Sequence, residues 1–473
     1  MARGRGCTPT PGDDRPDQHG RRLLQRVVYE GGAFRLRFAE SWALSALAGE
    51  TAARLGDKAT VKQIRADAKQ INKWVRFTPY LRFPPLHPEN PAIAGFFYDW
   101  LRHRTDGDYW QQWSPKQYYP KINIPVLNFD GWYDGFLDGG ISNFTGMVAG
   151  AATPFARANQ RLVIGPWDHL GWGRPGSTAA PLLQVIGPVG NSPINELMLA
   201  WWDHYLKGVN NGIGGGPRVD YFRMGSNTWH HSPSWPPTGA QNTPLYLHSG
   251  GRANTASGDG TLSANPPTGA ETADHYRYDP ADPVPTVGGH SCCSSAGNTS
   301  QGPYEQGQVE QRPDVLVYTT APLTQDTDVT GPLSVSLYAS STAPDTDWTA
   351  KLTVVHPDGQ SINLANGIQR ASYRDSSAHP SPITPGQVYR YTVNVWPTSN
   401  LFHAGDRIRL ALSSSDFPQF DPNPNTGGWL GDSTATQPAE QTILHDPAHP
   451  SVLTLSTIPN AARPPVQPGP PAK

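Results

Sequence analysis

The sequence predicts a protein of mixed class, α/β plus all-β. An incomplete α/β domain with a helical cap precedes a C-terminal β-sandwich of jelly-roll type. Two apolar strands without alternation, each followed by a turn and a helical segment, indicate the end of a parallel sheet. Farther along the chain, short strands of period two are separated by turns. The 48 Gly and 49 Pro residues among 473 favour turns and short strands over long helices.

The N-terminal part of the sequence reads as helical after an irregular start. Residues 1–26 are rich in Arg, Gly, Pro and Asp without any apolar period, so we expect a disordered segment or a wrongly placed start. We expect residues 27–120 to form a helical cap. Apolar residues recur at helical spacing in 34–47, 60–74 reads as a more polar helix, and 90–101 is a third helical segment.

The next segment, 121–217, alternates between strands and helices, so we assign it to the C-terminal part of an α/β domain. Apolar strands are expected at 124–129 and 160–164. Helices are expected at 141–148 and at 193–206, where a glycine soon follows and ends the second helix.

Residues 218–458 change to a pattern of short strands, and we expect the jelly-roll domain there. Pro, Gly, Asp and Ser turns separate the strands. Residues 459–473 are rich in Pro and are expected to form a disordered tail. The expected strands lie near 219–225, 244–249, 314–320, 333–340, 350–359, 389–396, 407–414 and 451–457.

Charge and hydropathy exclude several classes of partner. The formal net charge of −2 offers no electrostatic reason to expect nucleic acid. No apolar run is long enough to predict a membrane span. The first residues contain no apolar segment of a signal peptide, which slightly favours the cytoplasm, but the compartment stays open because the native N-terminus can lie upstream. A homo-oligomer also stays open.

Asp134 is the first candidate for chemistry. It follows the expected strand at 124–129 in the turn Trp-Tyr-Asp-Gly, and open α/β sheets place their sites at the carboxyl ends of strands. An Asp there can accept the Nδ1 proton of a His and stabilise the imidazolium that forms during catalysis. The alternative is an Asp that only caps the segment after the turn. Asp130 and Asp138 are rival candidates.

His169 is the second candidate. It follows the expected strand at 160–164 through Gly-Pro-Trp-Asp, and an Asp before a His is the chain order of the α/β-hydrolase fold. Its role would be general base toward a Ser and then general acid toward the leaving group. The chain has 15 His, so a packed or surface His is the alternative. Asp168 is expected to be a turn residue.

Other residues near these two are weaker candidates. Trp132, Trp167 and Trp172 are candidates for the wall of a substrate pocket, with burial in the core as the alternative. Asp203 and His204 lie on the expected helix at 193–206 and are expected to be structural. No His or Cys spacing fits zinc and no Gly-rich loop fits a nucleotide, so we expect no metal and no cofactor.

Several blocks of sequence together resemble the CocE/NonD family of serine hydrolases, which includes X-Pro dipeptidyl-peptidases of the S15 type. The resemblance extends from about residue 29 to about residue 455. No single block is specific, but their combination is. The blocks are YEGGAFRLRFAESWAL at 29–44, the stretch 125–136 with GWYDGF, GPWDH at 165–169, WWDHYLKG at 201–208, FRMGSNTWHHSPSWPP at 222–237, YDPADPVPTVGG at 278–289 and RPDVLVYTTAPL at 312–323.

The resemblance implies an α/β-hydrolase domain with a helical cap and a C-terminal jelly roll. It implies that Asp134 is the acid and His169 the base of a Ser-His-Asp triad. The implied reaction cleaves an ester or a short peptide through an acyl-enzyme, as in esterases and X-Pro dipeptidyl-peptidases.

The sequence departs from the family at the nucleophile. The family carries its Ser in a G-x-S-Y-x-G elbow before the block at 29–44, and residues 1–28 contain no Ser. Ser142 in GGISNFTG is the nearest substitute, but its glycines are wrongly spaced and it follows Asp134. We therefore expect that this chain lacks the nucleophile and is inactive alone. The alternatives are a non-catalytic jelly-roll protein that binds carbohydrate or a partner, and a decayed pseudoenzyme.

Overall fold

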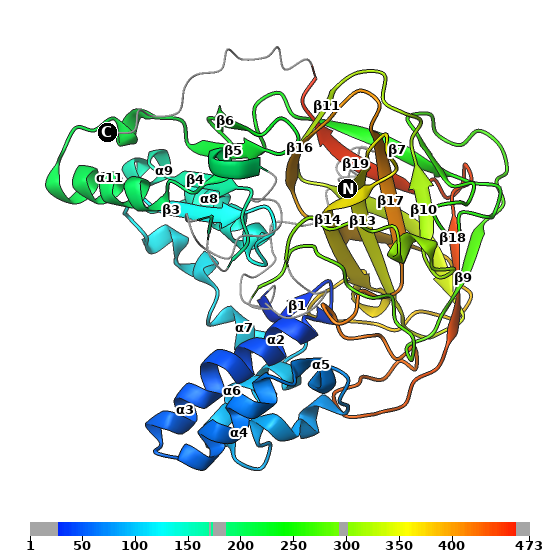
Figure 1. The fold of residues 1–473 in the computed structure, drawn as a ribbon, viewed down its shortest axis with the longest axis horizontal. Helices are drawn as coiled ribbons and strands as arrows, with labels where there is room; N and C mark the ends of the chain where they lie inside the picture. The colour runs from blue at the N-terminus through cyan, green and yellow to red at the C-terminus, as the bar shows by residue number, and fades with distance from the viewer. Residues whose placement is uncertain (1–26, 170–171, 174–185, 293–300, 460–473) are drawn as a thin grey trace, which may run out of the picture.

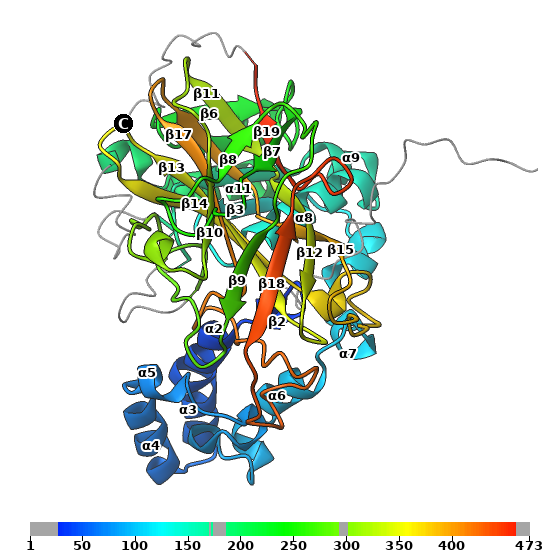
Figure 2. The ribbon, with the colours of Figure 1, turned by 90° about the vertical axis from the view of Figure 1, so that its right-hand side faces the viewer.

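The structure is a computed structural model, and it describes residues 27–169, 172–173, 186–292 and 301–459. The segments expected to be irregular, 1–26 and the tail after 459, therefore lie outside the described residues. Figure 1 shows three regions: a group of helices in blue, a small sheet with helices in cyan and green, and a large β region. The view in Figure 2 shows the same helical group standing apart below the strands.

The helical group forms where helical periodicity predicts it. Asp57 accepts a hydrogen bond from the Thr60 amide and begins the second of the expected helices, which ends at Ala68 and resumes at Ile71. Asn90 caps the third expected helix in the same way. The elements are β1 (Tyr29–Glu30), β2 (Ala33–Phe34), α2 (Leu36–Trp42), a π-helical turn (Ala43–Ala48), α3 (Gly49–Arg54), α4 (Lys58–Ala68), α5 (Ile71–Trp74), 3₁₀ turns at Tyr80–Arg82 and Pro84–Leu86, α6 (Pro91–Arg102), α7 (Asp108–Gln111) and a 3₁₀ segment (Pro115–Lys121).

The base of the helical group is fixed to the large β region. The amide of Phe34 donates a hydrogen bond of 2.7 Å to Asp421, and the amide of Arg370 donates one of 2.8 Å to the carbonyl of Gly31. Gly31 has a φ of +55°, and a Cβ there would lie 2.1 Å from the carbonyl oxygen of Ile368. Only glycine therefore permits this contact between the two regions.

The small sheet has the strand order β3-β4-β5-β6. Its strands are β3 (Leu127–Gly131), β4 (Arg161–Gly165), β5 (Val219–Arg223) and β6 (Thr228–Ser232). The first three are parallel and the last is antiparallel. Within the described part of the chain β3 pairs with β4 alone, so its other edge is open.

Two expectations about this sheet need correction. The first strand begins at Leu127 rather than at residue 124, because Ile124 is 59% exposed and Pro125 cannot donate to a ladder. The strand expected at 219–225 as the start of the jelly roll is β5, which pairs with β4. Pairing with a parallel neighbour cannot be read from the period of one strand.

Three helices accompany the sheet in the described chain: α8 (Leu137–Gly150), α9 (Pro154–Ala158) and α11 (Ile194–Lys207). The first and the last cover the helices expected at 141–148 and 193–206, whereas the sequence pattern did not predict α9. Gly208, in the left-handed conformation with a φ of +72°, ends α11. None of the helices in the described ranges is both long and apolar enough to cross a membrane.

The large β region contains strands β7–β19 in one hydrogen-bonded system that is almost entirely antiparallel. Seven of its strands fall on segments where the sequence predicts them. The strands are β7 (Gln241–His248), β8 (Thr261–Ser263), β9 (Asp274–Tyr278), β10 (Leu316–Thr319), β11 (Thr327–Gly331), β12 (Ser334–Ser341), β13 (Asp347–Val355), β14 (Ser361–Arg370), β15 (Tyr389–Asn394), β16 (Thr398–Phe402), β17 (Arg407–Ser413), β18 (Ala439–Leu444) and β19 (Val452–Thr457).

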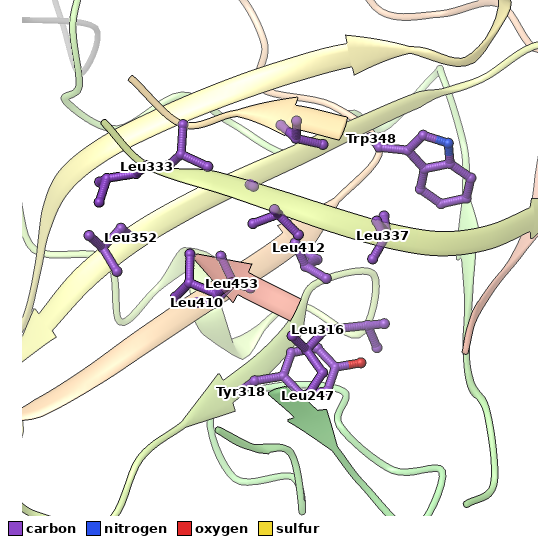
Figure 3. Packing of buried hydrophobic residues seen from close by; sticks show 14 of the residues in the cluster. Leu247, Leu316, Tyr318, Leu333, Leu337, Trp348, Leu352, Leu410, Leu412 and Leu453 are labelled. Carbon is purple, nitrogen blue, oxygen red and sulfur yellow. The ribbon is translucent and has the colours of Figure 1, made fainter. Parts of the chain in front are cut away.

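Alternating side chains of these strands form a continuous apolar core. Figure 3 shows Leu337, Leu352 and Leu410 pointing into the same interior, with Trp348 at one end. All four side chains are almost completely buried. This core belongs to the large β region and contains no residue of the small sheet.

Candidate active site

The loop that carries Asp134 is held at the carboxyl end of β3. The amide of Asp134 donates to the carbonyl of Gly131, and the amide of Tyr133 donates to the carbonyl of Trp167 in the loop after β4, both at 3.0 Å. A Cβ at Gly131 would lie 2.1 Å from that same Trp167 oxygen, so glycine allows the two loops to approach. The Asp134 side chain is buried and accepts a bond of 2.8 Å from the amide of Phe136.

The structure brings His169 to Asp134. The Nδ1 atom of His169 lies 2.9 Å from Oδ2 and 3.2 Å from Oδ1 of Asp134. Burial by itself lowers the pKa of His169, but the hydrogen bond and charge of Asp134, with a smaller contribution from Asp168, outweigh it and raise the pKa above its ordinary value. With Nδ1–H donated to the carboxylate, Nε2 is the atom that would exchange a proton with a reacting group.

Aromatic rings enclose the His169 side chain on two sides. The ring of Phe136 meets it edge-on with 4.7 Å between centroids, and Trp172 meets it edge-on at 5.9 Å. Trp172 therefore lies where a wall of a substrate site would be expected. It is the one predicted tryptophan that lies against the His169 ring.

The other two predicted tryptophans belong to the packed core. The indole nitrogen of Trp132 donates to the carbonyl of Phe222 at 2.7 Å, and that of Trp167 donates to the carbonyl of Gly190 at 2.6 Å. Both side chains are almost fully buried among other aromatic rings. The expectation that they line a pocket is corrected, because each indole uses its polar atom to satisfy the backbone and its rings to fill the core.

The rival carboxylates occupy different places from Asp134. Asp138 lies in the first turn of α8, and Asp168 is buried directly before His169. Asp130 points from β3 toward α8, and the structure shows no hydrogen bond between it and His169. Burial, reinforced by the nearby charge of Asp134, raises the pKa of Asp130 well above its ordinary value.

Three weaker candidates lie inside helices. Ser142 belongs to the second turn of α8 rather than to a sharp strand-to-helix turn. On α11, Asp203 forms an ion pair with Lys207 at 2.6 Å, and His204 contacts the carbonyl of Val209 at 3.0 Å. These contacts support a structural role for Asp203 and His204.

A residue of the N-terminal helical group, which the sequence analysis did not single out, holds the loop that carries Asp134, here called the acid loop. Arg35, which is fully buried, donates a bond of 2.8 Å to the carbonyl of Gly135, directly after Asp134. Burial lowers the pKa of Arg35, and the charges of Glu30 and Asp134 oppose that shift. The one hint of this role in the sequence is an Arg inside the apolar stretch FRLRF. An Arg that lies in solvent on the surface of a helix would produce the same pattern.

The large β region holds the same loop from the other side. Ser291 bridges the loop by accepting from the amide of Gly135 at 3.0 Å and donating to the carbonyl of Tyr133 at 3.3 Å. The guanidinium of Arg35 lies 5.6 Å from the ring of Trp396, whose indole donates to Glu30 at 2.8 Å. Residues distant in sequence therefore fix the position of Asp134.

Comparison with known proteins agrees with this arrangement. Residues 20–171 match the family described as X-Pro dipeptidyl-peptidase (S15 family), and residues 211–454 match the X-Pro dipeptidyl-peptidase C-terminal non-catalytic domain. The chain is 35% identical over 439 residues to cocaine esterase of Rhodococcus sp. (strain MB1 Bresler), covering 90% of this chain and 73% of that protein.

Two solved structures share the fold. An aminopeptidase from a marine sediment archaeon, Thaumarchaeota archaeon, has a TM-score of 0.71 at 24% identity, over 91% of this chain and 70% of that one. A CocE/NonD family hydrolase from Staphylococcus aureus has a TM-score of 0.57 at 16% identity, over 92% and 66% of the two chains.

The fold is thus that of an α/β-hydrolase region, with helices and a parallel sheet, followed by a large antiparallel β domain. The matched family and the curated relative define the class as that of hydrolases of the esterase or dipeptidyl-peptidase type. The chain belongs to the CocE/NonD family of serine hydrolases.

Proposed function

We propose that Asp134 and His169 are the acid and base of acyl transfer from an ester or short peptide substrate. The observation that carries this proposal is the 2.9 Å contact from Nδ1 of His169 to the buried carboxylate of Asp134. That contact sets the tautomer in which Nε2 can remove a proton from a seryl hydroxyl and then return it to the leaving group. Trp172, beside the imidazole, would contribute to the substrate pocket.

We also propose that this chain alone does not complete the triad and is inactive by itself. No G-x-S-x-G sequence occurs among its 473 residues. The open outer edge of β3, in the described part of the chain, is consistent with a sheet that has room for a further strand. Without a nucleophile, the rate enhancement should fall by roughly 10⁶-fold, the order seen when a triad serine is removed.

The division of the chain supports the same function. We propose that residues 27–120 are a helical cap beside the catalytic loops, since most of one apolar core lies within them and Phe417, Trp429 and Leu430 of the β region complete it. The β domain is proposed to be a jelly roll that begins at β7, because β5 and β6 pair with the α/β sheet. Its contacts to the acid loop through Ser291 give it a supporting role at the site.

Labelling with a fluorophosphonate serine probe, followed by intact mass measurement, tests the proposal. We expect no adduct on the folded chain. An adduct that disappears in His169→Ala would show that a serine of this chain completes the site, and peptide mapping would identify it. An adduct that persists in both His169→Ala and Asp134→Asn would mean that neither residue activates the serine.

A further inference from the structure

A polar cluster of three side chains lies on neighbouring strands of the large β region, outside the site described above. Figure 1 shows β14, β13 and β17 side by side, and hydrogen bonds join them in that order. Lys351 of β13 and Asn366 of β14 are directly paired, and Asp416 follows shortly after the end of β17. Side chains of directly paired residues share one face of a sheet, with Cβ atoms about 4.5–5.5 Å apart.

The three side chains line one small internal cavity. Its volume is about 20 Å³, which is room for about one water molecule. Asn366 is 2% exposed, Asp416 is 5% exposed, and the Lys351 side chain is 12% exposed. An amine, a carboxamide and a carboxyl group are therefore held close together in a nearly closed space. The described lining also contains the apolar residues Val284, Val309, Val315, Ala350 and Ala411.

The carboxyl group of Asp416 lies between the other two groups. Its Oδ2 accepts a hydrogen bond of 3.1 Å from Nδ2 of Asn366, and its Oδ1 lies 3.9 Å from Nζ of Lys351. Nζ of Lys351 also donates to Gln306 at 3.0 Å. In the described part of the chain, Oδ1 of Asp416 and Oδ1 of Asn366 have no hydrogen-bond partner. A carboxylate placed in this way can take a proton from the amine and deliver one to the nitrogen of the carboxamide.

We propose that Lys351 and Asn366 join through an isopeptide bond after the β domain folds, with Asp416 as the general base and then the general acid. The alternative is a permanent ion pair of Lys351 and Asp416 that only holds the strands together. Fixed proximity favours the covalent reaction, because well-oriented groups reach effective molarities of about 10⁵–10⁸ M. The reaction is independent of the acid and base proposed above.

The chemical step needs no external reagent. Asp416 takes one proton from the ammonium group of Lys351, and the free Nζ attacks Cγ of Asn366. The Cγ–Nδ2 bond then breaks, and Asp416 returns the proton to Nδ2. A second proton passes from the attacking Nζ to the same nitrogen, so that the leaving group is ammonia, which carries away the former lysine charge as ammonium. The chain thereby loses one NH₃, which is a mass of about 17 Da.

Intact mass measurement of the purified, unfolded chain tests the proposal. We expect a mass lower than that of the sequence by about 17 Da, the loss of one ammonia. Tryptic mapping should give one branched peptide that contains both residues, because trypsin does not cleave after an acylated lysine. Lys351→Arg keeps the positive charge but cannot form the bond, and Asp416→Asn removes the base, so both variants should have their full mass. Lys207→Arg, at an exposed lysine paired with Asp203, should keep the deficit.

A full sequence mass for the folded, unmodified chain would overturn the proposal. The same deficit in Lys351→Arg would also overturn it, because Asn366 precedes Gly367 and can lose ammonia by closing a ring with its own backbone. A branched peptide that still forms in Asp416→Asn would overturn the role of Asp416. Circular dichroism shows whether each variant folds. If Asp416→Asn does not fold, the unmodified chain and Lys351→Arg decide whether the bond exists.

Discussion

The large β domain and the small α/β sheet differ in how completely they bury their own groups. The β domain surrounds one deep apolar core, and its buried Arg370 is held by two carboxylates, Asp347 at 2.8 Å and Asp421 at 2.9 Å. Among the residues that the structure describes, the α/β sheet has an open edge at β3, and no residue forms a hydrogen bond or ion pair with the carboxyl group of Asp130. The loops of Asp134 and His169, which we propose to be catalytic, are thus carried by the less complete region and supported by the more complete one.

The α/β region also leaves large apolar side chains of α11 exposed to solvent. Leu206 is 74% exposed, Leu199 is 62% exposed and Trp202 is 49% exposed. Large apolar side chains that gather in solvent on one helix indicate a face able to contact another surface. We expect the β domain to determine the stability of the molecule, while the α/β region tolerates changes at its margins.

The largest expected effect is the loss of Arg370. Arg370→Ala would leave Asp347 and Asp421 buried without their counter-ion, which costs roughly 3–5 kcal/mol of unfolding free energy. Urea denaturation followed by fluorescence measures this. Arg277→Ala, which removes an exposed pair with Glu440, should cost less than about 1 kcal/mol. Equal costs for the two variants would show that the network is not a main source of stability.

A smaller and pH-dependent effect is expected at His445. This buried side chain lies 3.0 Å from both Glu271 and Asp274. Burial lowers its pKa, but the two carboxylates outweigh burial and raise the pKa above the ordinary value. The resulting stability is fully present below the unfolded pKa of about 6.5 and is lost as pH rises through the folded pKa.

For every unit by which the folded pKa exceeds the unfolded one, this contribution is about 1.4 kcal/mol. Denaturation from neutral to alkaline pH should therefore show a decline that is absent in His445→Gln. The half-buried His204 of α11, whose ring contacts the carbonyl of Val209 after the helix, offers a matched control in His204→Gln. A decline of equal size in all three chains would assign the pH dependence to other groups.

At the site, the expected effect is on protonation more than on stability. In Asp134→Asn the charge and the charge-assisted hydrogen bond that raise the pKa of His169 are lost, and only the smaller contribution of Asp168 then opposes burial. We expect the pKa of His169 to fall, as measured by NMR titration of the imidazole. Asp168→Asn should lower it less, because Asp168 acts only through its charge. An unchanged pKa of His169 in Asp134→Asn would show that Asp134 and His169 are not in contact in solution.

The smallest effect on stability is expected at the exposed face of α11. Leu206→Lys should change the free energy of unfolding by less than about 0.5 kcal/mol, because the side chain is already in solvent. It should reduce the binding of a hydrophobic dye. Trp201→Ala, on the buried side of the same helix, should cost roughly 3–5 kcal/mol. A large loss of stability from Leu206→Lys would mean that this face is covered in solution.

Much of the local structure follows from the sequence by itself. Helical spacing predicts α6 and α11 to within a residue or two, because one apolar stripe per helix must face a core. The helix expected at 60–74 is divided in the structure between α4 and α5. Period-two strands and their turns predict most of the antiparallel β domain. The order of Asp134 and His169 after two apolar strands predicts their meeting, since parallel strands carry their ends to one edge.

Only the tertiary structure decided which partners those elements take. The residue pattern of β5 fits either sheet equally well. In the structure β5 pairs with β4 and therefore belongs to the small sheet. Burial separated Trp132 and Trp167, which fill the core, from Trp172, which lies beside His169. Arg35 reaches Gly135 across 100 residues of sequence, and Asp130 comes to line a cavity with Trp396. Periodicity records which face of an element is buried, whereas the identity of the neighbour depends on long-range packing that no local pattern contains.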